Sequence, residues 1–215
     1  MNMKISPIGR GELFQAQLVL FVAIGLQIAV SLISEHLTFG PQYLIIATEI
    51  ALAVSLGLTT SNHGKFRRSA SIVLLGIISL ANISSFVLVA QSLINGTQQI
   101  TGYELLVSAV AIFLTNIIVF ALWYWEIDSP GLTGSKWSKH DKDFQFTQQD
   151  LEKDFPYWQP KFIDYLYLSS TNAINFAAAD AKPLTHQAKG LMGTQALISA
   201  FTLALVVARS VNILG

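Results

Sequence analysis

Residues 161–214 read KFIDYLYLSSTNAINFAAADAKPLTHQAKGLMGTQALISAFTLALVVARSVNIL, and this stretch decides which fold the chain can form. The part from 190 to 212 is almost uninterrupted in its apolar character, and it reaches the roughly 20 residues that a helix needs to cross a bilayer. The part from 162 to 179 is apolar but carries polar residues, and a short break at 180–186 separates the two parts. The pattern predicts a spanning helix at 190–212, preceded by a re-entrant or short helix at 162–179.

The composition of the whole chain is that of a membrane protein. Of its 215 residues, 52% are hydrophobic and only 12% are charged, which is about half the charged share of a soluble domain. The formal net charge is zero, so the charge indicates no nucleic-acid partner. We expect a single integral membrane domain over residues 1–215, with the lipid bilayer as its surroundings.

The sequence carries no signature of a soluble enzyme. It has no cysteine, which excludes disulfides, thiolate metal sites and cysteine nucleophiles. The four histidines share no metal-ligand spacing, and no phosphate-binding glycine loop, nucleophile elbow or zinc-protease motif is present. We therefore expect no enzymatic activity, no metal and no cofactor.

Hydropathy predicts the fold class as an all-α polytopic membrane helix bundle with about five spanning helices. The first apolar run is longer than the core of a secretory signal, so we expect it to stay as an anchor. The sequence Trp123-Tyr124-Trp125 at the end of the fourth run is typical of aromatic side chains at headgroup level. The predicted spans cover 13–34, 43–60, 70–94, 103–125 and 190–212.

The longest polar stretch is the predicted linker at 126–160. Its charges alternate in sign without apolar periodicity from 136 to 154, which favours a solvated connector over a second domain. Thr147 and Asp150 are spaced to cap a short helix across 148–155. Several aromatic residues of the linker indicate a segment that rests on the membrane interface: Phe144, Phe146, Phe155, Tyr157 and Trp158.

Basic residues predict the orientation. Ten of the 13 Lys and Arg residues lie in the N-terminal tail, the 59–69 loop and the 126–161 segment. These parts share one side if each of the first four helices crosses once, and the side rich in Lys and Arg is usually the cytoplasm. We expect a cytoplasmic N-terminus and linker, in the inner (plasma) membrane of a bacterium. This rule is satisfied whether the 162–179 segment re-enters the membrane or crosses it.

The C-terminal stretch resembles the pore module of potassium-channel proteins, in which a short pore helix precedes a filter and an inner helix. The residues that match the pore helix are Phe162, Asp164, Leu166, Tyr167, Ser169 and Thr171, followed by Asp180 and Pro183 after the filter position and by Ala208-Arg209 at the end of the inner helix. The residues from Ile174 to Ala179 stand where a potassium filter has its glycines. Glycine tolerates the backbone angles of such a filter, so this chain is not expected to select potassium.

A second resemblance covers roughly the C-terminal half of the chain. Residues 161–214, together with NIIVFALWYWEID at 116–128, resemble a group of uncharacterised bacterial integral membrane proteins of the DUF1345-like kind. This resemblance implies a multi-pass membrane fold and no particular activity.

Polar residues inside the predicted spans are the candidate site residues. Glu49 lies near the middle of an apolar span, where an ionisable group is costly unless it is paired, neutralised or hydrated. One interpretation makes Glu49 an ion or proton site. The other makes it a structural group that bonds across the bundle to Gln27, Asn82 or Asn116.

Asn172, Asn175 and Asp180 are the candidates in the segment that resembles a pore loop. Asn172 and Asn175 are three residues apart and so share a helix face, which must meet protein or water because lipid offers no hydrogen-bond partners. They either line a permeation path or hold the short helix in place. Asp164, near the start of the same helix, suits the helix N-terminus, where negative charge is favourable.

Small residues mark one face of the last helix. They repeat every four residues and would let another helix approach closely, either within the chain or in a homo-oligomer: Ala196, Ala200, Ala204 and Ala208. Two functions follow from the sequence as a whole. The chain is a channel-like or ion-transport protein with a degenerate pore loop, or it is a non-conducting membrane scaffold or partner subunit.

Overall fold

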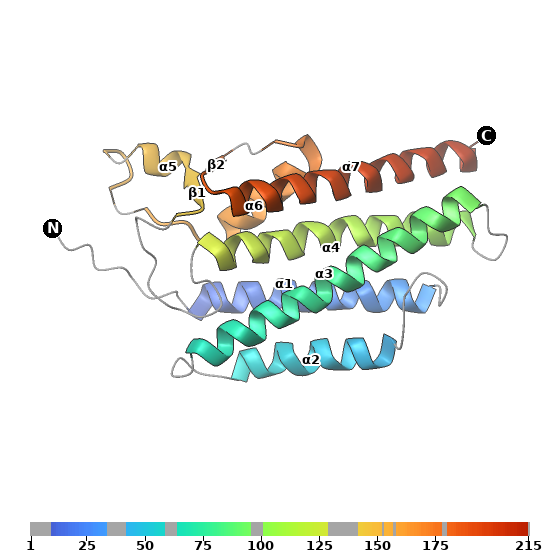
Figure 1. The fold of residues 1–215 in the computed structure, drawn as a ribbon, viewed down its shortest axis with the longest axis horizontal. Coiled ribbons are helices and arrows are strands. Elements are labelled where there is room, and N and C mark those ends of the chain that lie inside the picture. The colour runs from blue at the N-terminus through green and yellow to red at the C-terminus, as the bar shows by residue number, and fades with distance from the viewer. Residues whose placement is uncertain are drawn as a thin grey trace.

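The computed structural model of the protein describes residues 10–33, 42–58, 64–95, 101–128, 142–151, 153–156, 158–177 and 180–214. Over these residues it is a bundle of long helices with a small two-stranded sheet at one end (Figure 1). Its elements are α1 (Arg10–Ile33), α2 (Gln42–Leu58), α3 (Gly64–Asn95), α4 (Gly102–Asp128), β1 (Phe144–Phe146), α5 (Thr147–Asp150), α6 (Phe162–Asn175), β2 (Ala181–Pro183) and α7 (His186–Leu214).

Four helices of the described chain are long and apolar enough to cross a membrane. They contain the segments Phe14–Ile33, Ser69–Ser92, Gly102–Asp128 and His186–Ala208. This confirms a multi-pass helical membrane protein, but the prediction of five spanning helices was wrong. The predicted span at 43–60 is the 17-residue helix α2, whose length of about 26 Å, at 1.5 Å per residue, falls short of the ~30 Å hydrocarbon core.

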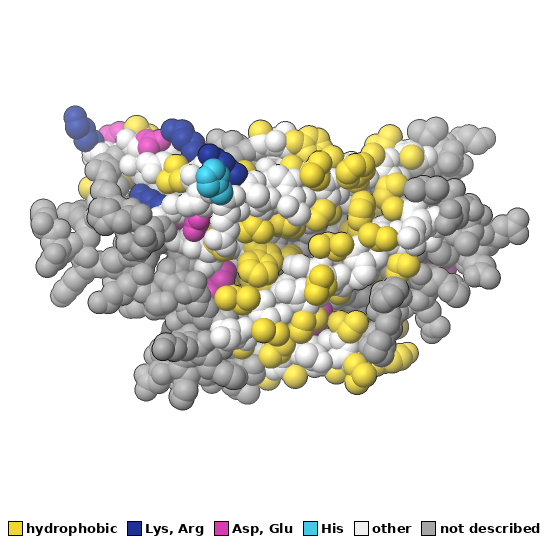
Figure 2. Space-filling model, viewed as in Figure 1, with side chains coloured by type: hydrophobic (Ala, Val, Ile, Leu, Met, Phe, Trp, Pro, Cys, Tyr) yellow, Lys and Arg dark blue, Asp and Glu magenta, His cyan; other side chains and the backbone are white. Residues whose placement is uncertain are grey.

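Charged and apolar side chains occupy different parts of the surface. Most of the charged side chains visible in Figure 2 gather around the sheet and the neighbouring ends of α4, α6 and α7, and apolar side chains cover much of the rest of that face. The spanning helices also expose large apolar groups, including Leu18 (55%), Leu80 (70%) and Phe201 (60%). A bilayer accounts for such exposure because its hydrocarbon solvates these side chains.

Helix α4 is the centre of the bundle. It packs against α1, α3, α6 and α7. Every residue from Thr115 to Leu122 is buried, whereas Val110 and Leu114, earlier in the same helix, are each 43% exposed. Eight consecutive residues point in all directions around a helix, so burial of all eight requires neighbours on every side. Helix α6 covers one of those sides over the second half of α4.

Helix α6 begins at the sheet end of the bundle, and the chain that follows the helix returns to the same end. At the start, the ring of Phe162 packs on Trp125 near the end of α4, with 5.3 Å between ring centroids. The helix ends at Phe176, whose φ of 56° is left-handed and stops the helical hydrogen-bond pattern. Beyond it, β2 pairs antiparallel with β1, with Phe144 opposite Pro183. Both flanks of α6 are thus tied to the sheet end.

The described part of the linker from 142 onward packs on the bundle, unlike the predicted solvated connector. Phe144 and Phe146 are 0% and 1% exposed, and Gln145 between them is not buried. This alternation is that of a strand with one buried face. The two phenylalanines face the protein interior. The ring centroid of Phe146 lies 5.3 Å from that of Tyr165 and 5.6 Å from that of Trp158. Phe144 and Phe146 therefore do not rest on the membrane surface, where they were predicted to lie.

The predicted helix at 148–155 is the single turn α5. The Gln149 side chain, rather than the Thr147–Asp150 pair, closes its first turn by accepting a hydrogen bond from Phe146 N at 3.1 Å. Part of the predicted aromatic surface remains, because Phe155 is 45% exposed, while Tyr157 lies outside the described residues.

Candidate functional site

A buried hydrogen-bond cluster joins α4, α6 and α7 at the position that resembles a pore helix. The Tyr124 hydroxyl donates to Gln195 Oε1 at 2.5 Å. Asn172 Nδ2 lies 2.8 Å from the same oxygen, 3.0 Å from Met192 O and 3.3 Å from the Tyr124 hydroxyl. These polar side chains are 0 to 2% exposed. Asn172 therefore binds protein on two helices.

The cluster continues to the backbone of α4 through Gln195. Gln195 Nε2 donates to Ser169 Oγ at 2.6 Å and to Ser169 O at 3.0 Å. Ser169 Oγ in turn donates to Ile117 O at 2.7 Å. One glutamine on α7 thus accepts with its oxygen and donates with its nitrogen, and each described partner is a protein atom.

A second cluster fixes the start of α6 against the sheet. Asp128, the last residue of α4, accepts through Oδ1 from the backbone N–H groups of Asp143 (2.7 Å) and Phe144 (2.8 Å). Its other oxygen, Oδ2, accepts from the Tyr165 hydroxyl at 2.6 Å. The Asp143 carboxylate also accepts from the Thr185 hydroxyl, just before α7. One buried carboxylate therefore holds α4, β1 and α6 together.

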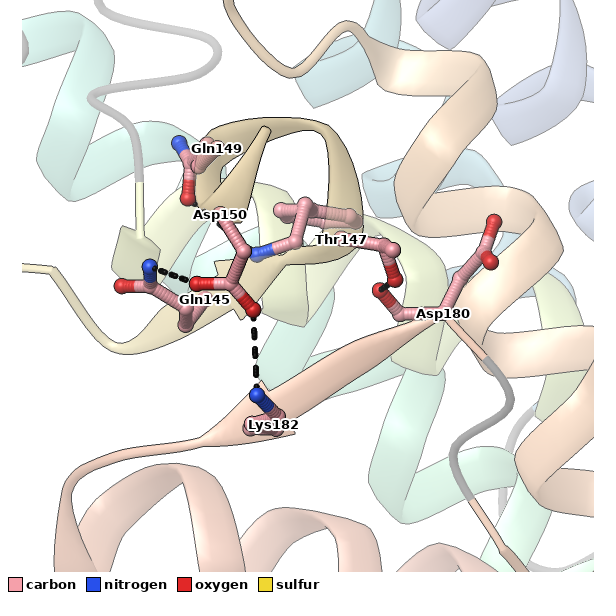
Figure 3. Close-up of polar contacts among 7 residues, drawn as sticks. Gln145, Thr147, Gln149, Asp150, Asp180 and Lys182 are labelled. Atoms are coloured by element: carbon pink, nitrogen blue, oxygen red, sulfur yellow. Dashed lines mark hydrogen bonds and ion pairs between the residues drawn. The ribbon is translucent and has the colours of Figure 1, made fainter. Parts of the chain in front are cut away.

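The far end of the α6 segment is held from α5 (Figure 3). Asp180 O accepts hydrogen bonds from Thr147 N and Thr147 Oγ1, both at 3.0 Å. Asp150 accepts from Gln145 Nε2 at 2.7 Å and forms an ion pair with Lys182 at 3.0 Å. The hydrogen bonds from Gln145 and Lys182 hold the pKa of the exposed Asp150 carboxyl below its ordinary value.

Glu49 lies apart from both clusters, between α2 and α1. Its side chain is 0% exposed. With the Gln27 amide turned so that its nitrogen faces α2, Nε2 lies 3.2 Å from both Glu49 oxygens. Nearby, Gln17 Nε2 donates to Ala53 O at 3.3 Å and links the same two helices. Of the three predicted partners of Glu49, the structure brings Gln27 to it.

The other two predicted partners of Glu49 have different positions. Asn116 Nδ2 donates to Ser199 Oγ on α7 at 2.9 Å, and both residues are buried. Asn116 Oδ1 is buried and has no hydrogen-bond partner within the described residues. Asn82 is buried on α3 at 5% exposure. The predicted polar interior is therefore divided among separate helix pairs.

The remaining predicted residues differ in their surroundings. Asn175 is exposed although it shares a helix face with the buried Asn172, and Asp180 is half-buried and bonds through its backbone oxygen. Asp164 Oδ2 accepts from Lys161 N at 2.7 Å, which closes the first turn of α6. The alanine face of α7 is divided, since Ala196 and Ala200 are half-buried while Ala204 and Ala208 are exposed.

Sequence reasoning missed most residues that bond to Asn172 and Asp128. Tyr124 and Trp125 were interpreted as headgroup aromatics, but they are 0% and 1% exposed and face the bundle interior. Gln195 carried a usable signal, because an amide within an apolar span must find a partner in the protein. Asp128 carried none, since an acidic residue at the end of a span is ordinary.

Comparison with family models, curated proteins and solved structures gives no match for this chain. The resemblances to the DUF1345-like group and to potassium-channel pore modules therefore stay predictions. Within the described residues, no group of three or more His, Asp or Glu side chains is placed to hold a metal ion.

The α4–α6–α7 cluster predicts energetic coupling between Tyr124 and Asn172. Tyr124→Phe and Asn172→Ala should each destabilise the protein by about 1–3 kcal/mol, because each leaves a buried group without its partner. Both side chains share the Gln195 oxygen, so the double variant should depart from additivity by at least about 0.5 kcal/mol. Unfolding in mixed detergent micelles measures all four proteins of the cycle.

The control for this cycle is Tyr103→Phe, which makes the same chemical change at a 71% exposed site on α4. It should change stability by less than about 0.5 kcal/mol. Strict additivity of Tyr124→Phe and Asn172→Ala would show that the cluster does not act as a unit.

Proposed function

We propose that this protein is a non-conducting membrane scaffold or partner subunit, and not an enzyme or a channel. The observation that carries the proposal is the position of Asn172. Its side-chain nitrogen lies within hydrogen-bonding distance of Tyr124, Gln195 and Met192 O. A residue that lines a permeation path must offer its polar atoms to water or ions, and the Asn172 nitrogen already binds protein.

The proposal includes a membrane arrangement. Helices α1, α3, α4 and α7 are the long spanning helices, and the shorter α2 carries the chain back from the far end of α1 to the sheet end, where α3 begins (Figure 1). Helix α6 enters from the sheet end and returns to it without crossing. The contacts at both flanks of α6 support this path. The basic residues around the sheet, among them Lys142, Lys153, Lys161, Lys182 and Lys189, support a cytoplasmic location for that end, with the N-terminus on the same side and the protein in a bacterial inner membrane.

The function proposed here predicts no ion flux. Purified protein in liposomes should give cation and proton leakage equal to that of protein-free liposomes, because the Asn172 nitrogen is bonded to α4 and α7 and does not line an open path. Flux assays with potassium, sodium and proton-sensitive dyes measure this. A protein-dependent flux that rises with the protein-to-lipid ratio and is reduced by Asn172→Leu would refute the proposal and favour a channel-like protein.

Glu49 carries a second candidate function, an ion or proton site. The observation in its favour is a fully buried carboxyl group whose partner in the structure is the uncharged amide of Gln27. A charged carboxylate in such a place is costly, and buried carboxyl groups in membranes often bind or carry cations. Under the scaffold function the same group is a hydrogen-bonding link between α1 and α2.

Two substitutions at Glu49 separate these functions. As a link, Glu49→Gln keeps a hydrogen-bonding group of similar shape and should retain stability, while Glu49→Leu leaves the Gln27 amide unpaired and should cost about 1–3 kcal/mol. Unfolding in detergent measures both. If the wild type conducts and Glu49→Gln abolishes a pH-dependent flux while the fold persists, Glu49 is a transport site and the link interpretation is wrong.

A further inference from the structure

The outward face of α6 is a membrane-embedded surface that nothing in the described chain covers. Ile163, Tyr167 and Ile174 are 57%, 50% and 57% exposed. Their spacings of four and seven residues place them along one line of the helix. Asn175 and Phe176 follow Ile174 at the end of the helix, beside this line, and both are exposed. We call these five residues the α6 outer face.

The far end of the α6 outer face lies at membrane depth. One turn earlier, Asn172 contacts Met192 and Gln195, which stand several residues inside the spanning segment His186–Ala208. In Figure 1 the helix ends alongside α7, well beyond the sheet. Asn175 therefore exposes an amide where the surroundings are hydrocarbon.

A bilayer solvates the apolar residues of this face but not Asn175. The amide has two N–H donors and one carbonyl acceptor, and lipid chains provide a partner for neither. Among the described contacts, the Asn175 side chain makes no hydrogen bond, and the neighbouring Asn172 already uses the polar groups of α4 and α7. Since no described residue of the chain supplies a partner, a second protein copy is the source that we consider.

We infer that the α6 outer face binds a second copy of this protein, with Asn175 of each copy hydrogen-bonded to Asn175 of the other. An amide is complementary to another amide, because each donates one hydrogen bond and accepts one. A two-fold axis beside Asn175 makes the same surface serve both partners. The flanking Ile174 and Phe176 supply the apolar contact around the asparagine pair. Polar side chains that hydrogen-bond between membrane helices usually lie within such apolar interfaces.

This inference deepens the proposed function, since it names the partner of the scaffold, and it rests on that proposal for the location of α6 in the membrane. It differs from the predicted self-association through the α7 alanines. Ala196 and Ala200 are half-buried within the chain, which leaves the α6 outer face as the surface that still needs a polar partner.

The absence of native cysteine allows a direct test on the full-length protein. Ile174→Cys places one thiol beside Asn175 and leaves the amide intact. Oxidation with membrane-permeant copper phenanthroline in native membranes should yield a covalent dimer at several times the level seen for Val73→Cys. Val73 is the matched control because it is also an exposed apolar residue, 53% exposed, in the spanning part of α3.

Variants at Asn175 then test the amide itself. Adding Asn175→Leu to Ile174→Cys should reduce crosslinking to the Val73→Cys level, whereas Asn175→Gln should retain most of it. Equal crosslinking of the Ile174→Cys and Val73→Cys variants, or crosslinking that Asn175→Leu leaves unchanged, would overturn the inference. Native mass spectrometry of the wild type from nanodiscs is the second measurement, in which dimers are expected and monomers alone would contradict it.

The proposed dimer interface and the proposed scaffold function can be refuted independently of each other. If the Ile174→Cys variant crosslinks and the protein also conducts ions, this interface stands and the scaffold function is refuted. If the protein does not conduct and the Ile174→Cys variant does not crosslink, the scaffold function stands and this interface is refuted.

Discussion

Within a bilayer no solvent competes for hydrogen bonds, so a polar group on a membrane helix needs a partner in the protein. The structure satisfies this constraint with side-chain amides. Gln195 bonds to Tyr124 and Asn172 through its oxygen and to Ser169 through its nitrogen. These bonds hold α6 against α4 and α7, and α6 in turn covers the second half of α4. The burial of eight consecutive α4 residues depends on this attachment.

The polar sheet end gives α6 its path. Asp128 binds the start of the helix through Tyr165 and binds β1 through two backbone N–H groups. Because β2 pairs with β1, the chain that follows α6 must come back to the same end. A short apolar helix held in this way can occupy the membrane interior without crossing. Its polar side chains Ser169 and Asn172 bond to atoms of α4 and α7, and under the proposed function they serve attachment rather than permeation.

Sequence patterns predicted the helices well and their contacts poorly. Apolar runs of about 20 residues locate spanning helices directly, because bilayer thickness sets their length. The same criterion overcounted α2, whose run is a few residues too short. Periodicity missed β1, since three residues of alternating burial give little signal. The partners of Asn172 and Glu49 depend on how helices rotate and pack. Sequence reasoning therefore showed that these residues need partners and included Gln27 among three candidates for Glu49, but it named no partner of Asn172. The left-handed Phe176 that ends α6 is also invisible in the sequence, because glycine is the usual residue there.

The path of α6 is tested most directly by labelling its two flanks with a membrane-impermeant maleimide. Lys161→Cys and Leu184→Cys place single thiols before and after the helix, at an exposed position and at one that is 48% exposed, and Tyr103→Cys marks the opposite end of α4. We expect the Lys161→Cys and Leu184→Cys variants to be labelled in inside-out vesicles and not in intact cells, and the Tyr103→Cys variant to be labelled in intact cells. Labelling of the two flanking positions from opposite faces of the membrane would show that α6 crosses it and would contradict the re-entrant path.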